Sequence, residues 1–197
     1  MAKVDLAFSL MSQQAIPADH GYVLYGALSR NMPSLHTSNG IGVHPVRGQQ
    51  IGDRRLSLTS HSRLVLRIDT DDISQILPLA GKQLDVLGAV LRVGVPQVWS
   101  LRFAPALRSR LVTIKLPDGI EPESFEQAIR RQLNAMNVST EVIVTIGKRR
   151  TLRIKDKEVV GYEVILEGLT AEESLDVLEI GIGGRRHMGC GVFVALR

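Results

Sequence analysis

The chain is poor in several features, and each shortage excludes a class of protein. A single cysteine among 197 residues rules out an internal disulfide framework and a cysteine-built zinc site, and it is typical of a reducing cytoplasm. No stretch approaches the roughly 18 consecutive apolar residues of a membrane span. The first residues, MAKVDLAF, lack the basic and then apolar pattern of a secretory leader, so we expect a cytoplasmic protein.

Aromatic residues and nucleotide-binding signatures are scarce too. Phe, Trp and Tyr make up 4% of the chain, which argues against base stacking as the main way of binding nucleic acid. There is no GKS or GKT string, so a P-loop is excluded, and the glycine-rich string near the C-terminus does not lead from a strand into a helix as a dinucleotide loop does. What remains is a globular chain, 44% hydrophobic and 22% charged, whose net charge of +4 favours an anionic partner.

Hydrophobic periodicity predicts the secondary structure of the first half. Its expected elements are a strand over 3–11, a helix over 20–31 capped by Asp19, a long loop over 33–52, a hairpin formed by 54–58 and 62–68, a short helix ending at Pro78, and strands on both sides of Gly88. The first helix directs Leu24, Ala27 and Leu28 inward. The long loop has little periodicity, and such loops in compact domains are usually functional or disordered.

The second half repeats this order of elements. They are a strand over 109–116, a helix opened by Glu121 and Pro122, a strand starting at EVIVTI, hairpin strands over 151–155 and 159–167 with a turn near Asp156, a helix with the T-x-x-E capping box of Thr170 and Glu173, and the terminal strand GVFVAL. Two successive β-α-β-β-α-β units predict an α+β protein of two tandem ferredoxin-like domains. We expect the first domain over 1–96, a linker over 97–108 and the second domain over 109–197.

A glycine-rich string, GIGGRRHMGCG at 181–191, lies between the last predicted helix and the last strand. Glycines permit positive φ and close backbone approach, so exposed N–H groups of this loop could meet a phosphate chain, and its cations could reinforce the contact. The candidate phosphate-binding residues are Gly183, Gly184, Arg185, Arg186 and His187. The alternative is a tight connection that only needs glycine.

Residues 148–157, KRRTLRIKDK, form the densest basic run, with six basic side chains and one acid. A strand here would present a row of cations, which can follow a phosphate backbone. That row is Arg149, Arg153, Lys155 and Lys157, opposite Leu152 and Ile154. An ordinary charged solvent face is the alternative. The candidate RNA contacts of this region are Lys148, Arg149, Arg150, Arg153 and Lys155, together with Arg130 and Arg131 of the preceding helix.

The chain resembles the CRISPR repeat-processing endoribonucleases of the repeat-associated (RAMP) superfamily. The glycine string before a last strand marks the superfamily, and further strings across nearly the whole chain are similar to the subtype called MYXAN. These strings are DHGYVLYGALS (19–29), PSLH (33–36), GVHPVRG (42–48), LPLAGKQLDV (77–86), SRLVTIK, RRTLRIKDKEVVGYEV and GIGGRRHMGCGVF.

The resemblance implies a reaction and a partner. Family members bind the repeat hairpin of a CRISPR transcript and cut it without metal or other cofactor, by attack of a 2′-hydroxyl on the adjacent phosphodiester. The products carry a 2′,3′-cyclic phosphate and a 5′-hydroxyl, and mature guide RNA results. Such a reaction needs a base, an acid and positive charge against the phosphorane.

The resemblance also implies which residues carry the reaction. His36, just beyond the first helix, matches the family's catalytic histidine, and histidine exchanges protons near neutrality. His44 could be the acid, hold the phosphate, or simply lead into Pro45. Arg47 could stabilise the pentacovalent phosphate. Some relatives carry a tyrosine on the first helix where this chain has Ser29, and Tyr25, one helical turn earlier, could take that role or simply pack.

The other histidines and the cysteine have simpler interpretations. His20 is expected to order the start of the first helix, His61 to be solvated in a turn, and Cys190 to pack.

Two alternative functions stay open at this point. One is a non-catalytic RNA-binding subunit of a CRISPR effector complex, which would share the glycine string but would not need a histidine in the loop after the helix. The weaker one is a double ferredoxin-like metabolite-binding protein, which would show no salt-sensitive RNA affinity. Partnership with effector subunits is compatible with the leading hypothesis as well.

Overall fold

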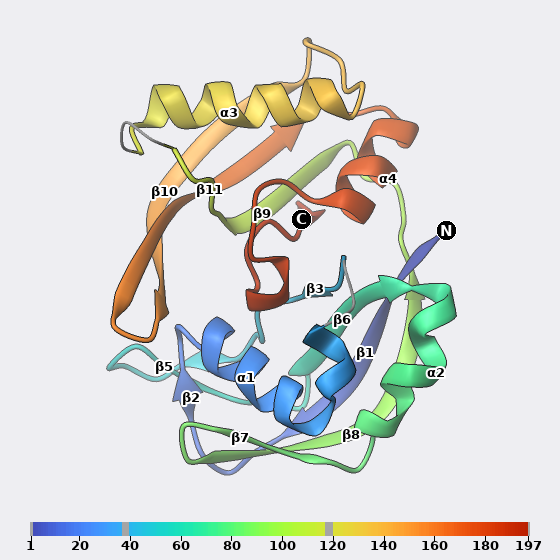
Figure 1. Ribbon diagram of the computed structural model, residues 1–197, viewed down its shortest axis with the longest axis vertical. Helices are drawn as coiled ribbons and strands as arrows, with labels where there is room; N and C mark the ends of the chain where they lie inside the picture. The colour runs from blue at the N-terminus through green and yellow to red at the C-terminus, as the bar shows by residue number, and fades with distance from the viewer. Residues whose placement is uncertain (1, 37–39, 117–119, 197) are drawn as a thin grey trace. The chain divides into compact units, whose positions relative to one another are not determined.

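The computed structural model describes residues 2–36, 40–116 and 120–196, except for the side chain of His36. The chain forms two compact units, Met1–Ser100 and Leu101–Arg197, each with its own main sheet and its own hydrophobic core (Figure 1). No helix in the described ranges is both long and apolar enough to cross a membrane.

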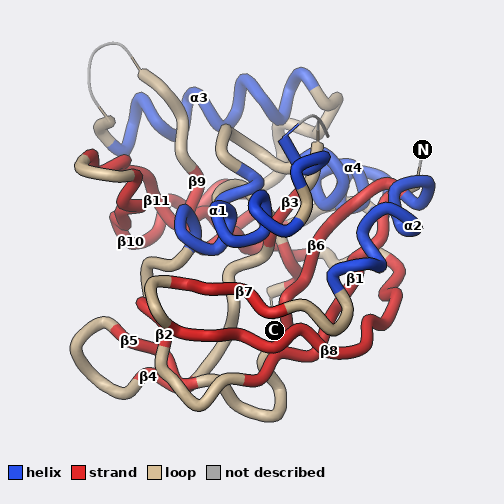
Figure 2. Tube along the Cα trace, turned by 60° about the horizontal axis from the view of Figure 1, so that its bottom comes forward, coloured by secondary structure: helices blue, strands red, loops and turns tan. Residues whose placement is uncertain are grey.

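The first unit is built on a five-stranded antiparallel sheet with the strand order β3-β6-β1-β8-β7. Figure 2 traces its long strands, in which β8 of the β7–β8 hairpin pairs with β1. Its elements are β1 (Lys3–Met11), β2 (Ile16–Pro17), α1 (Gly21–Asn31), η1 (Pro33–His36), β3 (Gly42–Val43), β4 (Gln49–Gln50), β5 (Arg55–Ser57), β6 (Arg63–Asp69), η2 (Thr70–Asp72), α2 (Ile73–Ile76), η3 (Leu77–Leu79), β7 (Gln83–Val86) and β8 (Ala89–Ser100).

The order of β1, α1, β3, β6, α2 and β8 is the predicted β-α-β-β-α-β order, and the ferredoxin-like arrangement is confirmed. Alternation along β1 places Leu6, Phe8 and Leu10 in one core with Leu24 and Leu28 of α1. Both helices of this unit contribute to that core, so they cover the same face of the sheet.

The predicted hairpin of 54–58 and 62–68 is wrong. β5 pairs with β2 and β4 in a small separate sheet, whereas β6 pairs with β1 and β3. The ferredoxin-like strand beside β6 is therefore β3, only Gly42–Val43, inside the stretch predicted as a loop. Two residues are too short for a visible alternation, so the longer run that forms β5 carried the stronger signal.

The predicted cap of α1 is wrong by one residue. The N-cap is His20, not Asp19, and the His20 side chain makes no capping hydrogen bond. His20 is buried, its Nδ1–H donates to the Pro17 carbonyl oxygen at 2.9 Å, and its Nε2 accepts the Val46 N–H at 2.9 Å. It therefore fixes the helix start to a later segment, which is the ordering role expected of it.

The second unit has the same order on a four-stranded antiparallel sheet, β10-β11-β9-β12. Its elements are β9 (Ala106–Val112), α3 (Pro122–Ala135), β10 (Ile143–Ile154), β11 (Lys157–Glu167), α4 (Ala171–Ile180), η4 (Arg186–Met188) and β12 (Val194–Ala195). The capping box of Thr170 and Glu173 is confirmed, with both reciprocal hydrogen bonds present. Phe125 of α3 packs against Tyr162 of β11 with ring centroids 5.0 Å apart, at the centre of this core.

Strand bounds in the middle of the chain differ from the prediction. β8 continues through Pro96 to Ser100, and β9 begins at Ala106 instead of residue 109 and ends at Val112. The reason is pairing, since β1 faces β8 as far as Ser100 and β11 faces β9 from Ala106. Residues 101–105 lie between the two strands.

Candidate functional site

The segment after α1 carries the residues to which the sequence assigns the chemistry. α1 ends at Asn31, and the turn η1 follows. Leu35 of this turn is buried in the core of the first unit and anchors the turn there. His36 is the last residue of this turn. Its side chain and residues 37–39 lie outside the described part of the chain, so the structure places only the backbone of the predicted base.

Ser29 occupies the inner side of α1. Its side chain is 8% exposed, and its Oγ has no hydrogen-bond partner among the described residues. A buried hydroxyl without a partner costs about 1–3 kcal/mol. The position is therefore close-packed, and the structure pairs its hydroxyl with neither His44 nor Arg47.

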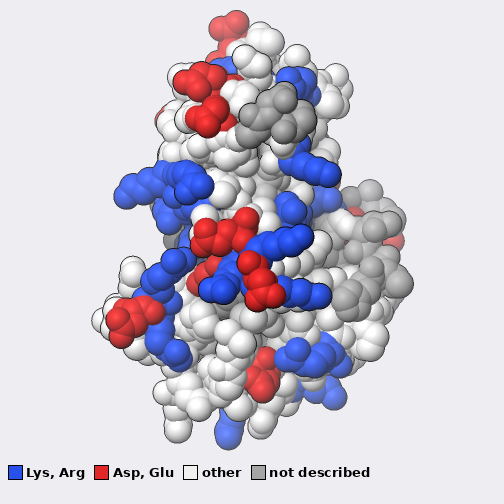
Figure 3. Space-filling view, turned by 60° about the vertical axis from the view of Figure 1, so that its left-hand side comes forward, with Lys and Arg blue, Asp and Glu red and all other residues white. Residues whose placement is uncertain are grey.

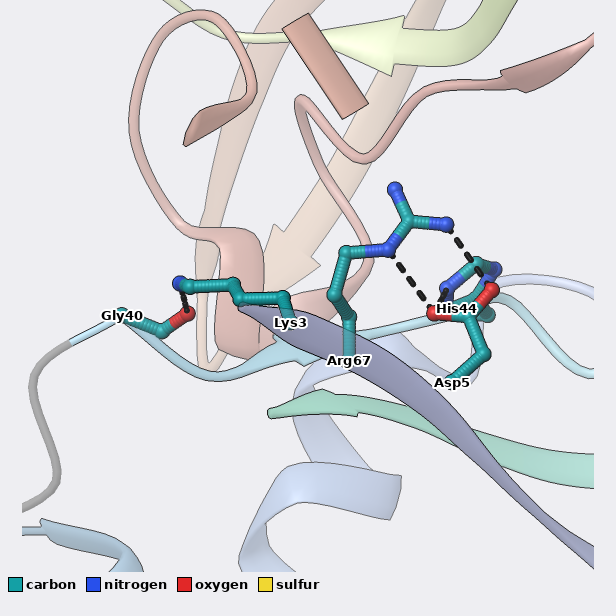
Figure 4. A network of polar contacts seen from close by, with 5 residues as sticks. All are labelled: Lys3, Asp5, Gly40, His44 and Arg67. Carbon is teal, nitrogen blue, oxygen red and sulfur yellow. Dashed lines mark hydrogen bonds and ion pairs between the residues drawn. The ribbon is translucent and has the colours of Figure 1, made fainter. Parts of the chain in front are cut away.

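His44 belongs to a buried ion-pair network that the sequence did not reveal (Figure 4). Its Nε2–H donates to Asp5 Oδ1 at 3.2 Å. Arg67 holds the same carboxylate with two bonds, from Nε to Oδ1 at 2.8 Å and from Nη2 to Oδ2 at 2.9 Å. Asp5 and Arg67 are direct partners in the β1–β6 ladder, so the sheet itself brings the two side chains together.

The combined effect of burial and neighbouring groups lowers the pKa values of both His44 and Asp5. Burial lowers the pKa of His44 against the opposing effect of the Asp5 carboxylate, so the imidazole is neutral at pH 7. Burial raises the pKa of the Asp5 carboxyl, but the hydrogen bonds from His44 and Arg67 and the positive charge of Arg67 outweigh it and hold that pKa well below the usual range. Asp5 is therefore ionised, and His44 is a neutral hydrogen-bond donor.

Side chains from two other strands or turns bind the backbone on either side of His44. Lys3 Nζ donates to the Gly40 carbonyl oxygen at 2.7 Å, and Ser62 Oγ donates to the Arg47 carbonyl oxygen at 2.7 Å. The side chain of Arg47 itself is exposed. The structure thus fixes the backbone of Arg47 and leaves its guanidinium accessible to an anion.

The glycine loop, residues 181–191, is shaped by close backbone contacts in the second unit. Gly181, Gly183, Gly189 and Gly191 all have positive φ. A Cβ on Gly183 would lie 2.5 Å from the Thr113 carbonyl oxygen, and one on Gly191 would lie 2.0 Å from that of Ile182. Glycine is required at these positions by conformation and by space.

The N–H groups of this loop are mostly used within the unit, which corrects the expectation of exposed donors. Gly183 N–H donates to Gln132 Oε1 and Gly184 N–H to the Thr113 carbonyl oxygen, at 2.8 and 2.9 Å. Gly191 N–H donates to the Leu111 carbonyl oxygen at 2.8 Å. The N–H groups of Gly183, Gly184 and Gly191 are therefore already used, and the cationic side chains of the loop remain candidates for contact with a phosphate.

Those side chains are half-buried and partly engaged. Arg185 has a left-handed backbone and lies 3.4 Å from Thr113 Oγ1 through its Nη1, and Arg186 donates to the Ile180 carbonyl oxygen. His187 lies in the turn η4 that follows. Cys190 is fully buried with Leu111 and Leu152, so its packing role is confirmed.

The basic run forms the β10–β11 hairpin, but its predicted cationic face is wrong. Lys155 lies in the turn with φ of 53°, and Lys157 begins β11, so neither continues the row of Arg149 and Arg153 along β10. Arg149, Arg153, Lys155 and Lys157 are all exposed. Figure 3 views the molecule from the side of this hairpin and shows lysine and arginine side chains with acidic ones among them.

Two arginines of the candidate set have acidic partners. Arg150 is half-buried, with Nη2 4.0 Å from Glu163, and the same carboxylate pairs with Arg108. Arg130 on α3 pairs with Glu126 at 2.9 Å, and Arg131 is exposed. The exposed cations of the hairpin and of α3 are the ones available to a nucleic acid.

Among the described residues, no three His, Cys, Asp or Glu side chains are grouped closely enough to hold a metal ion. The sequence reasoning missed Lys3, Asp5 and Arg67, because an isolated charged residue in an alternating strand looks like any solvent-facing position.

The chain consists of two ferredoxin-like units in tandem, and the second has a glycine loop before its last strand. The Cas6 family model, described as Cas6 Crispr, matches residues 4–197. The CRISPR-associated endonuclease Cas6 of Myxococcus xanthus (strain DK1622) is 39% identical over 194 residues, which cover 98% of this chain and 82% of that protein. The chain belongs to the Cas6 family.

Solved structures agree with this fold. A CRISPR associated protein Cas6 has a TM-score of 0.66 at 13% identity, covering 99% of this chain and 100% of that one. A Cas6-related protein from Pyrococcus furiosus has a TM-score of 0.66 at 16% identity, covering 99% of each chain. A RAMP protein binding different RNA substrates has a TM-score of 0.67 at 13% identity, covering 98% of this chain and 100% of that one.

Proposed function

We propose that this protein is an endoribonuclease that binds the repeat hairpins of a CRISPR transcript and cuts them to release guide RNA. The observation that carries the proposal is the 39% identity to a CRISPR-associated endonuclease across 98% of the chain. The proposed substrate is a transcript, which places the activity in the cytoplasm. The exposed cations and the scarcity of aromatic residues favour recognition of a stem by its shape and phosphates.

The proposed reaction is an attack of a repeat 2′-hydroxyl on the adjacent phosphorus, without a metal. The O–P bond to the 5′-oxygen breaks as the new bond forms, giving a 2′,3′-cyclic phosphate and a 5′-hydroxyl. His36 takes the proton of the 2′-hydroxyl, and the leaving 5′-oxygen takes its proton from solvent water. The place of His36 beside the buried Leu35 gives its backbone a fixed support. Arg47 supplies charge against the phosphorane, since its backbone is tied to Ser62 and its guanidinium is exposed.

The geometry of His44 and Ser29 does not favour proton transfer by either side chain. His44 is buried, and its Nε2–H donates a hydrogen bond to Asp5. Ser29 is buried on the inner side of α1. We therefore assign the chemistry to His36 and Arg47.

Side chains in the second unit are the proposed RNA contacts. The exposed cations of the β10–β11 hairpin and of α3 bind phosphates, and the half-buried cations of the glycine loop add to them. Gly183 and Gly184 contribute by shaping the loop, because their N–H groups are already bonded within the unit. The residues proposed to contact RNA are Arg130, Arg131, Lys148, Arg149, Arg150, Arg153, Lys155, Arg185, Arg186 and His187.

The test is cleavage of a cognate repeat RNA in EDTA, followed on a denaturing gel. We expect the wild type to cut once, and His36→Ala to reduce the cleavage rate at least about 100-fold, the lower end for loss of a general base, with little change in RNA affinity. A matched control is His61→Ala, since His61 is exposed in a turn and should leave the rate unchanged.

A repeat with a 2′-deoxy substitution at the cut site should bind and stay whole. Cutting of that RNA would contradict the proposed nucleophile, and dependence on added metal would contradict the metal-free route. Tight binding with no cleavage by the wild type would favour the second candidate, a non-catalytic RNA-binding subunit of an effector complex.

A further inference from the structure

We propose that Asp5, Arg67 and His44 are positioning residues, which set the register of β3 and so place Arg47. This inference rests on the proposed function, because it concerns how the proposed catalytic segment is held. It assigns His44 the part of a neutral hydrogen-bond donor and gives it no proton-transfer step.

β3 needs further contacts to set its register because it is very short. Only Gly42 and Val43 pair with β6, opposite Arg67 and Leu66, and one further bond joins His44 N–H to the Val65 carbonyl oxygen at 2.9 Å. So short an edge strand specifies its register weakly. A slip by one residue would exchange the two faces of the strand, and every later residue up to Arg47 would be displaced.

Side-chain hydrogen bonds fix the register that the short β3–β6 ladder specifies only weakly. Across the sheet, Arg67 is the ladder partner of both Asp5 on β1 and Gly42 on β3. Asp5 receives two hydrogen bonds from Arg67 and one from His44, which is two residues beyond Gly42. The carboxylate therefore links three adjacent strands, and only one register of β3 brings His44 within reach.

A second anchor of opposite charge lies two residues away on β1. Lys3 and Asp5 share one face of the strand, and Lys3 Nζ donates to the Gly40 carbonyl oxygen at 2.7 Å (Figure 4). The two anchors hold residues 40 and 44, on both sides of β3. The interval between them contains β3, so the start and the end of β3 are both fixed.

The chemistry of the network suits a positioning role. Ionic groups in such places cost more to bury than apolar ones and are best attested as devices that specify register. Arg67 is 4% exposed, and its charge balances that of Asp5. The charged groups that face His44 are Asp5 on β1, Arg67 on β6 and Arg47 on its own segment.

The deciding comparison is His44→Gln against His44→Leu. A glutamine amide can place an N–H donor near the position of the imidazole Nε2–H, but it cannot exchange protons near neutrality. We expect His44→Gln to keep the single-turnover cleavage rate within about three-fold of wild type with the same pH–rate profile. His44→Leu should cut at least about ten-fold more slowly, with RNA affinity within about three-fold.

Asp5→Asn should resemble His44→Leu, because it removes the charge that Arg67 and His44 share. The matched control is Asp71→Asn in η2, an exposed carboxylate outside the network, which should leave the rate unchanged. Equal losses in His44→Gln and His44→Leu would overturn the proposal in favour of a catalytic imidazole, and a normal rate in His44→Leu would overturn it as well. If Asp5→Asn fails to fold, the His44 pair decides the question alone.

A readout independent of cleavage separates this inference from the proposed function. Hydrogen exchange at the amides of Val43, His44 and Val46 should be faster in His44→Leu and unchanged in His44→Gln. That result would support the inference even if the wild type did not cut RNA. Unchanged exchange in His44→Leu would overturn it.

Discussion

At the scale of single residues, the glycine loop shows how conformation and space act together. Gly191 has φ of +67°, and a Cβ there would lie 2.0 Å from the Ile182 carbonyl oxygen. By contrast, Gly184 in the same loop has no positive φ, and its Cβ would lie 4.0 Å from the nearest atom, the Thr113 carbonyl oxygen. The two glycines therefore differ in what they contribute.

We predict that Gly191→Ala lowers the free energy of unfolding by about 3 kcal/mol or more, because a left-handed residue and a backbone overlap are introduced together. Gly184→Ala is the control and should change stability by less than about 1 kcal/mol. Urea unfolding followed by circular dichroism measures both. Equal effects of the two substitutions would show that the positive φ and the close approach at Gly191 are not what the loop depends on.

The residues that the sequence could identify were those with a local signature. The capping box of Thr170 and Glu173 and the glycine loop are short patterns with a physical cause, and both are in place. The network of Asp5, Arg67 and His44 spans 62 residues of chain, so no local pattern could connect its members. Side-chain pairing across a sheet requires knowledge of the strand order, which could be predicted only for the strongly periodic elements.

At the scale of elements, long periodic segments were predicted well and short ones were not. β1, α3 and β11 lie close to where the periodicity placed them, whereas the strand predicted at EVIVTI and the one predicted over 151–155 form a single strand, β10. β3 was missed because two residues have no period, and β5 was assigned to the wrong sheet because its alternation resembles that of any strand. Pairing is a tertiary property, and it decided both cases.

The β10–β11 hairpin carries a prediction about RNA affinity. Changing its exposed Arg149, Lys155 and Lys157 to Gln should weaken repeat binding, because cations that meet phosphates are removed. The slope of log Kd against log salt should fall by about 0.7–0.9 for each phosphate that the variant no longer neutralises. Filter binding at several salt concentrations measures the slope.

A matched control for the hairpin is the triple change of Arg54, Lys82 and Arg92 to Gln, three exposed cations of the first unit. It removes the same net charge from a different place, so it should leave the slope nearly unchanged. If both triples lower the slope equally, the affinity depends on total charge and not on the hairpin.

At the scale of the whole molecule, the order of helices and strands was the most reliable prediction from the sequence. The β-α-β-β-α-β order occurs twice, and it predicted the fold although the two halves share no visible residue pattern. Each unit then builds a separate core, one around Phe8 and one around Phe125. The layer architecture depends on the order of the helices and strands and on which face of each is apolar. It could therefore be predicted although some element bounds were wrong.

We predict that a large-to-small substitution in one hydrophobic core lowers the stability of its own unit most. Phe125→Ala should lower the stability of Leu101–Arg197 by about 3–5 kcal/mol, since the fully buried ring contacts both α-helix and sheet neighbours. Phe8→Ala is the reciprocal change in Met1–Ser100. Hydrogen exchange resolved by peptide should show the larger loss of protection in the substituted unit each time, and loss spread evenly over the chain would contradict the prediction.

The buried Cys190 gives this protein a built-in reporter. It is the only cysteine in the sequence, and it lies within the glycine loop with no exposed surface. A thiol reagent added to the native protein can modify it only when that region opens, so the rate of modification measures the opening. Every molecule labelled in this way carries one probe at one known place, without any engineered site.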